Sequence, residues 1–285
     1  MSCLSVKRTA SCSGSLYLLI GLIIGLCICL VPPAYAEAAS RDVDLEERWE
    51  ILRQQLFGEQ ELVENDGVIQ VEAPGRAFDG ARVPITVRSL LPHDSTDVIE
   101  KLYIIVDNNP MPVAGTFDFE TDTQWDTLDT ELRINEYSYL RAVAQLDDGR
   151  LFMSSSYVKA VGGCSAPPSS YERSDATLLG SFSGGVEELF NPKVPAVARI
   201  RLVHPNASGM QFDQFTRTYI PAHYIHTIQA KFNQKTLVTL STNFSLGQDP
   251  VLGFNFKPDE AGKLTLSAID SKNKVFEQNW HVSGI

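Results

Sequence analysis

The pattern of apolar and polar positions divides the chain into one helical stretch followed by a long series of strands. Leu45, Trp49, Leu52, Leu56 and Phe57 recur at the spacing of a single helix face. Acidic residues gather just before and within the first turn, where the positive end of a helix dipole favours negative charge. The pattern predicts one amphipathic helix over residues 45–57.

After this helix, short runs rich in β-branched and aromatic residues alternate with Pro, Gly, Asn and Asp. This alternation is typical of an all-β sandwich. The first set of predicted strands is Val68–Val71, Arg82–Val87, Leu102–Asp107, Gly115–Asp118, Glu131–Ile134, Tyr139–Leu146 and Leu151–Val161. A turn at Asp147-Asp148-Gly149 joins the last two as a hairpin.

Regular alternation weakens between Ser165 and Pro192, where Pro167-Pro168-Ser169-Ser170 and the run from Ser181 to Gly185 are typical of a linker. A second set of predicted strands follows at Ala198–Val203, Thr218–Ile220, Ile225–Phe232, Leu237–Leu240, Val251–Phe256, Gly262–Asp270 and Val275–Trp280. We therefore predict an all-β fold of two immunoglobulin-like β-sandwich domains, at residues 37–166 and 193–285, joined by a linker at 167–192. The N-terminal amphipathic helix belongs to the first domain.

The first 36 residues have the features of a secretory signal peptide. Lys7 and Arg8 precede an apolar run of about 16 residues, and Ala34-Tyr35-Ala36 forms an Ala-x-Ala cleavage site. The run is short for a membrane span, which needs about 20 residues. We expect cleavage after Ala36 and export to the periplasm, with a retained anchor and lipidation at Cys27 or Cys29 as competing interpretations.

Removal of this leader changes both the charge and the cysteine content. Of 24 basic residues two leave, so 22 remain against 35 acidic residues, a net charge of −13. Nucleic acid is therefore excluded as an expected partner, and no membrane contact is expected after cleavage. Cys164 is the one cysteine beyond residue 36, so no internal disulfide is expected.

Cys164 follows Gly162-Gly163 at the end of a predicted strand and precedes Ser165 and a break in regular structure. We interpret Gly162, Gly163 and Ser165 as a flexible arm that keeps the thiol outside the core. Such a cysteine serves as a covalent attachment site, although a chance free thiol in a loop is the alternative. No basic residue directly adjoins Cys164 in sequence, so a depressed thiol pKa is not predicted.

Other candidate sites carry less weight. His223 and His226 lie three apart, which places them on opposite faces of a strand, so a metal site with His204 or Asp213 is not expected. Ser183 lacks the surroundings of a hydrolase nucleophile, and Trp49, Trp125 and Trp280 favour core or interface packing. A further group indicates a solvated acidic face rather than a calcium site: Asp118, Glu120, Asp122, Asp126, Asp129 and Glu131.

The residues of the first domain resemble the sulfur-carrier subunit SoxY. The resemblance rests on several stretches: Leu56-Phe57-Gly58, Val83-Pro84-Ile85-Thr86-Val87, Asn109-Pro110-Met111-Pro112-Val113, Phe117-Asp118-Phe119, Leu132-Arg133-Ile134, residues 142–149 and Val158-Lys159-Ala160-Val161-Gly162-Gly163-Cys164. The last stretch is the most specific. The second domain resembles the partner subunit SoxZ at Arg199-Ile200-Arg201, His204-Pro205, Ile220-Pro221-Ala222-His223-Tyr224-Ile225 and residues 254–262.

The chain thus resembles the fused SoxYZ-like carriers associated with quinoprotein dehydrogenases. The resemblance implies that Cys164 holds sulfur intermediates of thiosulfate oxidation as thiosulfonate or persulfide adducts, with no other cofactor, no metal and no catalytic residue. It implies periplasmic sulfur-oxidation enzymes or a quinoprotein dehydrogenase as partners, and no separate SoxZ-like subunit. In the family the cysteine sits in a Gly-Gly-Cys-Gly-Gly arm at a free end, whereas here Ser165-Ala166-Pro167-Pro168 follows, so the arm is tethered on both sides.

Three functions follow as hypotheses. The first is a non-enzymatic periplasmic carrier that binds sulfur intermediates through Cys164 and presents them to partner enzymes. The second is a non-covalent accessory or maturation protein of a periplasmic quinoprotein (PQQ) dehydrogenase. The third, a thiol-dependent redox enzyme, is the weakest because no resolving cysteine is present after residue 36.

Overall fold

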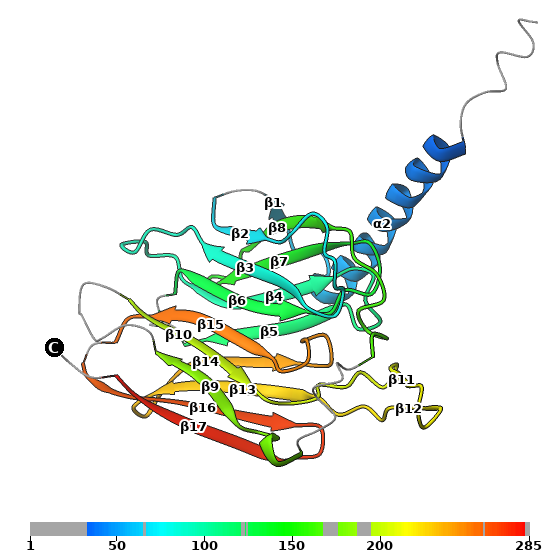
Figure 1. Ribbon diagram of the computed structural model, residues 1–285. Coiled ribbons are helices and arrows are strands. Elements are labelled where there is room, and N and C mark those ends of the chain that lie inside the picture. Colours follow the sequence, from blue (N-terminus) through cyan, green and yellow to red (C-terminus); the bar gives the residue numbers. More distant parts are fainter. Residues whose placement is uncertain are drawn as a thin grey trace, which may run out of the picture. The chain divides into compact units, whose positions relative to one another are not determined.

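The structure is a computed structural model that describes residues 33–64, 67–120, 123, 125–167, 176–186, 195–258 and 260–282, with side chains from Asp44 onward (Figure 1). Residues 1–32 of the expected signal peptide lie outside the described residues, so cleavage after Ala36 stays a prediction. The chain divides into two compact units, Met1–Glu47 and Arg48–Ile285, and the second contains all the strands. In the described part of the chain, no helix combines the length and the apolar character that a membrane span requires.

The predicted helix is present as α2, which spans Pro33–Phe57 and so begins earlier than the apolar spacing indicated. It ends at Phe57 because Gly58 takes a left-handed conformation (φ 61°) and its N–H bonds back to the Gln54 carbonyl at 3.0 Å. Trp49 and Phe57 are buried against one sheet. They form a small apolar cluster with Ile105, Val143, Leu151 and Met153.

The first half of the chain forms eight strands. These are β1 Leu62–Glu64, β2 Ile69–Glu72, β3 Val83–Ser89, β4 Ile99–Val106, β5 Val113–Phe119, β6 Thr127–Leu132, β7 Ser138–Leu146 and β8 Leu151–Val158. Every strand predicted in this half is present with shifted ends, and β1 was not predicted. β7 is buried on both faces because α2 covers the outer face of its sheet, whereas β2 alternates buried and exposed positions.

The second half forms nine strands and one short 3₁₀ helix. These are η2 Ala176–Leu178, β9 Phe182–Val186, β10 Ala196–Leu202, β11 Phe212–Asp213, β12 Thr218–Tyr219, β13 Ile225–Phe232, β14 Lys235–Thr242, β15 Val251–Phe256, β16 Gly262–Asp270 and β17 Val275–Val282. All strands predicted in this half are present. The prediction of an all-β fold is confirmed.

The prediction of an irregular linker at 167–192 is wrong at β9. Phe182–Val186 pairs antiparallel with β10, and the Trp280 indole N–H donates to the Gly184 carbonyl at 3.1 Å. Gly184 has a φ of 88° and lies so close to the backbone of β10 that a Cβ would come within 2.1 Å of the Arg199 oxygen. Glycine is required here for close strand packing, and its presence gave the segment the composition of a linker.

Strand pairing joins the two halves of the chain edge to edge. The nine-stranded sheet has the order β1-β8-β7-β4-β5-β14-β13-β16-β17, and the six-stranded sheet has the order β2-β3-β6-β15-β10-β9. Both sheets cross from one half to the other, through the pairs β5–β14 and β6–β15 (Figure 1). One apolar core, with residues from both halves, fills the space between the two sheets. The two sandwiches therefore form one continuous structure.

Candidate functional site

The segment that carries Cys164 leaves the end of β8 and lies along the residues that follow β6. The Gly162 N–H donates to the Asn135 carbonyl at 2.7 Å, and the Gly163 N–H donates to the Ile134 carbonyl at 3.1 Å. A turn closes over the cysteine, since the Ser165 N–H donates to the Gly162 carbonyl at 3.2 Å. These backbone bonds give the segment a defined path along the first half of the chain.

Gly163 packs directly against the backbone of Gly80. A Cβ on Gly163 would lie 2.0 Å from the Gly80 carbonyl oxygen and 2.6 Å from that of Ile134. Residue 163 therefore has to be glycine so that the two backbones can meet, while Gly162 has a positive φ of 70°. The structure thus gives Gly163 a packing role and Gly162 a left-handed backbone conformation, where the sequence indicated a hinge.

Side chains from the second half of the chain hold the segment from its other side. The Ser208 hydroxyl donates to the Cys164 carbonyl oxygen, and the Gln211 amide donates to the Ala166 carbonyl at 2.9 Å. Both side chains are buried, and the Ser208 N–H is bonded to the Gln211 side-chain oxygen at 3.3 Å. We call Ser208 and Gln211 the clamp.

The thiol of Cys164 is inaccessible in this conformation. The residue has 0% of its surface exposed and is a free cysteine. Burial raises the pKa of the thiol to about 11, although the charge of Arg133 lowers it in part. The expectation of a thiol outside the core, on a free arm of Gly162, Gly163 and Ser165, is wrong for this conformation, because backbone bonds, close glycine packing and the clamp fix the segment.

Arg133 lies immediately after β6 and is buried beside the cysteine segment, with 1% of its surface exposed. Its guanidinium donates to the carbonyl of Gly163 at 3.0 Å and to the carbonyl of Asn206 at 3.3 Å. One side chain therefore connects the cysteine segment with the second half of the chain. This role could not be predicted from the sequence, because Arg133 and Cys164 are 31 positions apart.

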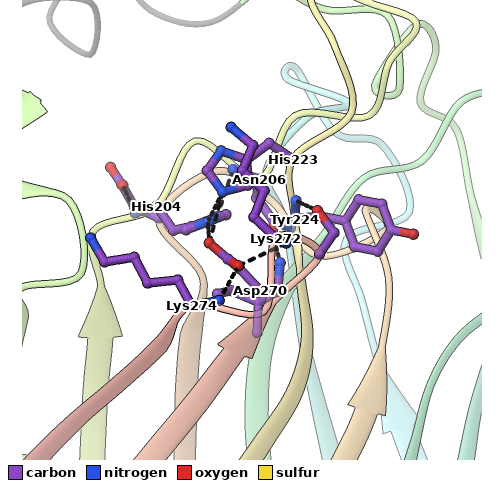
Figure 2. A network of polar contacts seen from close by, with 10 residues as sticks. His204, Asn206, His223, Tyr224, Asp270, Lys272 and Lys274 are labelled. Atoms are coloured by element: carbon purple, nitrogen blue, oxygen red, sulfur yellow. Dashed lines mark hydrogen bonds and ion pairs between the residues drawn. The ribbon is translucent and has the colours of Figure 1, made fainter.

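A second polar group, formed by His204, His223 and Asp270, lies in the second half of the chain (Figure 2). The Nε2 atoms of the two histidines are 3.3 Å apart, and the Asp270 Oδ2 atom is 2.8 Å from that of His223 and 3.6 Å from that of His204. We call these three residues the histidine–aspartate cluster. Both histidines were considered as metal ligands from the sequence, whereas Asp270 was not, since it follows them by 47 positions or more.

The protonation of this cluster follows from its hydrogen bonds. Burial raises the pKa of Asp270, but hydrogen bonds from His223 and from the backbone of Lys274 and Lys272 outweigh this effect and lower it to about 2. Burial, with a further effect of the His223 charge, lowers the pKa of His204 to about 4. At neutral pH, Asp270 is therefore a carboxylate and His204 is a neutral ring.

The tautomer of His204 opposes a metal at this cluster. Its Nδ1 atom accepts a hydrogen bond from the Asn206 backbone N–H at 3.1 Å, so the single proton of the neutral ring lies on Nε2, the atom that faces the cluster. A histidine that binds a metal through Nε2 instead carries its proton on Nδ1 and donates it outward. The cluster is better explained as a hydrogen bond from the His223 Nε2–H to the Asp270 carboxylate at 2.8 Å, with the His204 Nε2–H facing the same carboxylate at 3.6 Å.

This cluster anchors the segment that ends in the clamp. Asn206 is fully buried, donates to the Leu246 carbonyl at 2.7 Å and accepts from the Ile225 N–H at 2.8 Å. His204 and Asn206 thereby fix the start of the segment that continues to Ser208 and Gln211. The cluster and the clamp are two parts of one connected structure.

The remaining candidates have structural roles. His226 bonds to the adjacent Thr227 hydroxyl, and Asp213 accepts from the Phe215 N–H in a turn. Ser183 lies in β9. Several residues of the acidic group face basic side chains: Asp118 pairs with Lys101, Asp129 with Arg199, and Glu131 with Arg82. Trp49 and Trp125 are buried, in agreement with the predicted packing role.

Comparison with known protein families gives two matches in one chain. Residues 53–164 match the sulfur oxidation protein SoxY, and residues 192–281 match the sulphur oxidation protein SoxZ. The first match ends at Cys164 itself, and the second includes the clamp and the histidine–aspartate cluster. No curated protein matches the chain.

Among solved structures, the sulfur carrier protein SoxY from Chlorobium limicola f thiosulfatophilum is 24% identical and covers 42% of this chain and 98% of its own, with a TM-score of 0.36. A superoxide reductase (neelaredoxin) from Ignicoccus hospitalis is 18% identical and covers 36% of this chain and 97% of its own, with a TM-score of 0.30. Both TM-scores lie below 0.5, so these similarities establish no shared function.

Proposed function

The chain belongs to the SoxY–SoxZ sulfur oxidation family as a fusion of both proteins, and from this premise we propose that it carries sulfur intermediates covalently on Cys164 and presents them to partner enzymes. The two family matches support a carrier role in sulfur oxidation. The observation that supports Cys164 as the attachment site is that the SoxY match ends at this residue, the one cysteine beyond the predicted cleavage site. On this proposal the chain transports its cargo and other proteins transform it.

The covalent step is a displacement at sulfur. The Cys164 thiol loses its proton to solvent, and the thiolate attacks an electron-poor sulfur atom of a polysulfane-type compound. A new S–S bond forms at Cys164, while the original S–S bond breaks and its electron pair leaves with the departing sulfur anion. No external oxidant is needed, because the sulfur compound is reduced as the thiol is oxidised.

The buried thiol requires that the carrier works between a closed and an open conformation. A thiol with a pKa raised to about 11 is almost entirely protonated at neutral pH, and its inaccessible side chain cannot meet a reagent. The clamp consists of two side-chain hydrogen bonds, each of which contributes about 1 kcal/mol. Release of the clamp would loosen the segment on the side of the second half of the chain, and full opening would also break the backbone bonds of Gly162 and Gly163 and the bond from Arg133 to Gly163.

We place this function in the periplasm, after removal of residues 1–36, with sulfur-oxidation enzymes or a quinoprotein dehydrogenase as partners. The fusion makes a separate SoxZ subunit unnecessary, because both family matches lie in one chain and share two sheets. The two matches include Cys164, at the end of the first, and the clamp and the histidine–aspartate cluster, within the second.

A second candidate function is a non-covalent accessory protein of a periplasmic quinoprotein dehydrogenase. The burial of Cys164 favours it, since a docking protein needs no accessible thiol. The carrier function requires that the Cys164 thiol becomes accessible and forms a covalent adduct, whereas the accessory function does not require this thiol.

Intact-mass spectrometry of protein purified from its own periplasm tests the proposal. A carrier shows a mass increase that disappears on reduction and that is absent from a Cys164→Ser variant. Ser165→Ala is the matched control, because Ser165 is the exposed neighbour on the same turn, and it should keep the adduct. Full complementation of a deletion strain by Cys164→Ser would establish the accessory function instead.

A further inference from the structure

The histidine–aspartate cluster is joined to the clamp by backbone hydrogen bonds. The Ala207 N–H donates to the His223 carbonyl at 2.7 Å, and the His223 N–H donates to the Ala207 carbonyl at 3.0 Å. Ala207 directly precedes Ser208, whose hydroxyl donates to the Cys164 carbonyl oxygen. One short path of bonded atoms therefore connects the cluster with the segment that buries the thiol.

A hydrogen bond to the His204 ring makes this path sensitive to protons. The neutral ring has its proton on Nε2, and Nδ1 accepts from the backbone N–H of Asn206, which lies beside the cluster (Figure 2). A second proton can bind only at Nδ1, and both ring nitrogens are then donors. The Asn206 N–H would face another N–H, and because both residues are fully buried, no water replaces the lost acceptor.

Asn206 transmits this conflict to the clamp. Its carbonyl accepts from Arg133, and its side chain donates to the Leu246 carbonyl and accepts from the Ile225 N–H. These bonds prevent the residue from turning its backbone N–H towards another acceptor, so it has to move as a whole. Ser208 lies two residues further along the chain, and movement of Asn206 therefore shifts the clamp hydroxyl.

The surroundings of His204 disfavour a second proton in the closed conformation. The Asp270 carboxylate favours the charged ring, but burial and the charges of His223 and Lys272 outweigh it and lower the pKa of His204 to about 4. The backbone N–H of His204 also donates to the Asp249 carboxylate at 3.0 Å. The charged and titratable groups that surround the ring are Asp249, Asp270, His223, Lys272, Lys274 through Phe276, and Arg133 through Asn206.

We propose that the histidine–aspartate cluster controls the clamp through protonation, so that uptake of a proton by His204 displaces Asn206 and Ser208 and opens the segment that buries Cys164. As a form of regulation, this inference rests on the proposed carrier function. The thiol is closed at neutral pH and becomes accessible in a mildly acidic medium.

Proton linkage gives the size of the effect. The pKa of His204 is about 4 in the closed conformation, and a ring that opening exposes to water returns to the ordinary value of 6.5. The open conformation therefore binds the proton first as pH falls, and opening becomes more favourable below pH 6.5. Between pH 7 and pH 5, the ratio of open to closed molecules should rise about 20-fold.

The test measures how often the Cys164 thiol becomes accessible. Protein purified from its own periplasm is reduced and then treated with 4,4′-dithiodipyridine, which stays reactive towards thiols in mild acid. The thiol loses its proton to solvent, and the thiolate attacks one sulfur of the reagent to form a mixed disulfide. The other sulfur leaves with the electron pair of the broken S–S bond and takes up a proton as 4-thiopyridone.

The labelling rate of the folded protein is divided by that of the urea-unfolded chain at the same pH, which removes the effect of thiol ionisation. Because the closed thiol is fully buried, it reacts only after opening, and the quotient reports opening alone. We expect this quotient to rise about 20-fold from pH 7 to pH 5.

Two altered proteins separate the cluster from general effects of acid. His204→Asn keeps an acceptor oxygen near the Nδ1 position but cannot take up the proton, and the Ser208→Ala/Gln211→Ala protein lacks the clamp. In both, the quotient should change less than about threefold between pH 7 and pH 5. His226→Gln removes a histidine outside the cluster and should keep the wild-type rise.

A full rise in His204→Asn or in the protein without the clamp would overturn the inference, as would a constant quotient in the wild type. Labelling that accelerates with urea as steeply as global unfolding would also overturn it, because the thiol would then react only in unfolded molecules. If circular dichroism shows that His204→Asn does not fold, the comparison of the wild type with the protein without the clamp still decides. Complementation by Cys164→Ser tests the carrier function separately.

Discussion

The hydroxyl of Ser208 donates a hydrogen bond to the carbonyl oxygen of Cys164, across the boundary between the SoxZ and SoxY matches. In a complex of separate subunits, such a bond would join two chains. Here it lies within one chain, where the segment is also tethered on both sides. Access to the sulfur atom thus depends on residues that follow it by more than 40 positions.

Removal of the clamp should expose the thiol. Ser208→Ala and Gln211→Ala each delete one side-chain hydrogen bond to the cysteine segment, worth about 1 kcal/mol, so each should increase the rate of Cys164 alkylation by iodoacetamide about fivefold. The measurement is the alkylation rate at pH 8 by mass spectrometry. Gln229→Ala is the control. It removes a side-chain bond between Gln229 in β13 and Thr239 in β14, which does not involve the cysteine segment, and it should leave the rate unchanged. Equal rates in all variants would show that the clamp does not limit access.

Gly163→Ala should expel the segment from its closed position. The added methyl group would meet the Gly80 and Ile134 carbonyl oxygens, which are backbone atoms and cannot move aside as a side chain could. We expect a loss of stability of about 1–3 kcal/mol in urea unfolding together with faster alkylation of Cys164. Gly75→Ala, at a position with open space around the Cβ, should change neither quantity. If the Gly163→Ala protein were as stable as the wild type and alkylated as slowly, the close packing of Gly163 against Gly80 would be contradicted.

The buried thiol should make the protein lose stability at high pH. The folded state raises the pKa of Cys164 from its ordinary value of 9.0 to about 11, so the unfolded chain ionises first as pH rises. This contribution is fully present below pH 9 and is lost as pH approaches 11, by roughly 2–3 kcal/mol in total. Urea unfolding between pH 8 and 11 should show this decline, and a Cys164→Ala variant should lack it. An identical decline in both proteins would place the titrating group elsewhere.

His204 should govern part of the stability at mildly acidic pH. Its pKa falls from 6.5 to about 4 on folding, so its contribution is present above pH 6.5 and is lost as pH falls towards 4. Asp270 also loses its contribution on acidification, but at lower pH, between 3.8 and about 2. The slope of unfolding free energy between pH 6.5 and 4.5 should therefore be smaller in His204→Gln than in the wild type. His226→Gln, outside the cluster, should keep the wild-type slope.

The sequence predicted those parts of the fold that local alternation determines. Long strands such as β7 and β16, with buried and exposed positions set by hydrophobic residues, were located within a few residues. β9 was missed because Ser183, Gly184 and Gly185 carry no alternating pattern, and only the adjacent strand β10 makes that segment a strand. The joining of the two sandwiches was also missed, since the pairing of β5 with β14 links positions more than 100 residues apart.

At the candidate site, too, the features that depend on neighbouring residues were predicted, and those that depend on contacts between distant residues were not. Cys164 was identified from its immediate neighbours, but its burial depends on Gly80, Arg133 and Ser208, none of which lies near it in sequence. A pair of glycines before a cysteine has the same composition whether it forms a hinge or permits close backbone contact, so sequence alone could not distinguish the two. Asp270 was missed for a similar reason, because it meets the two histidines only through the fold of the turn after β16.

The pairing of β5 with β14 and of β6 with β15 has a consequence for how the chain must be made. If either half were produced alone, two strands would expose rows of unpaired backbone N–H and C=O groups, which invite aggregation with other chains. Each half pairs with the exposed edge strands of the other, and this pairing removes the edges at which other chains could add. Joining the halves in a single polypeptide ensures that both are always present in equal amounts.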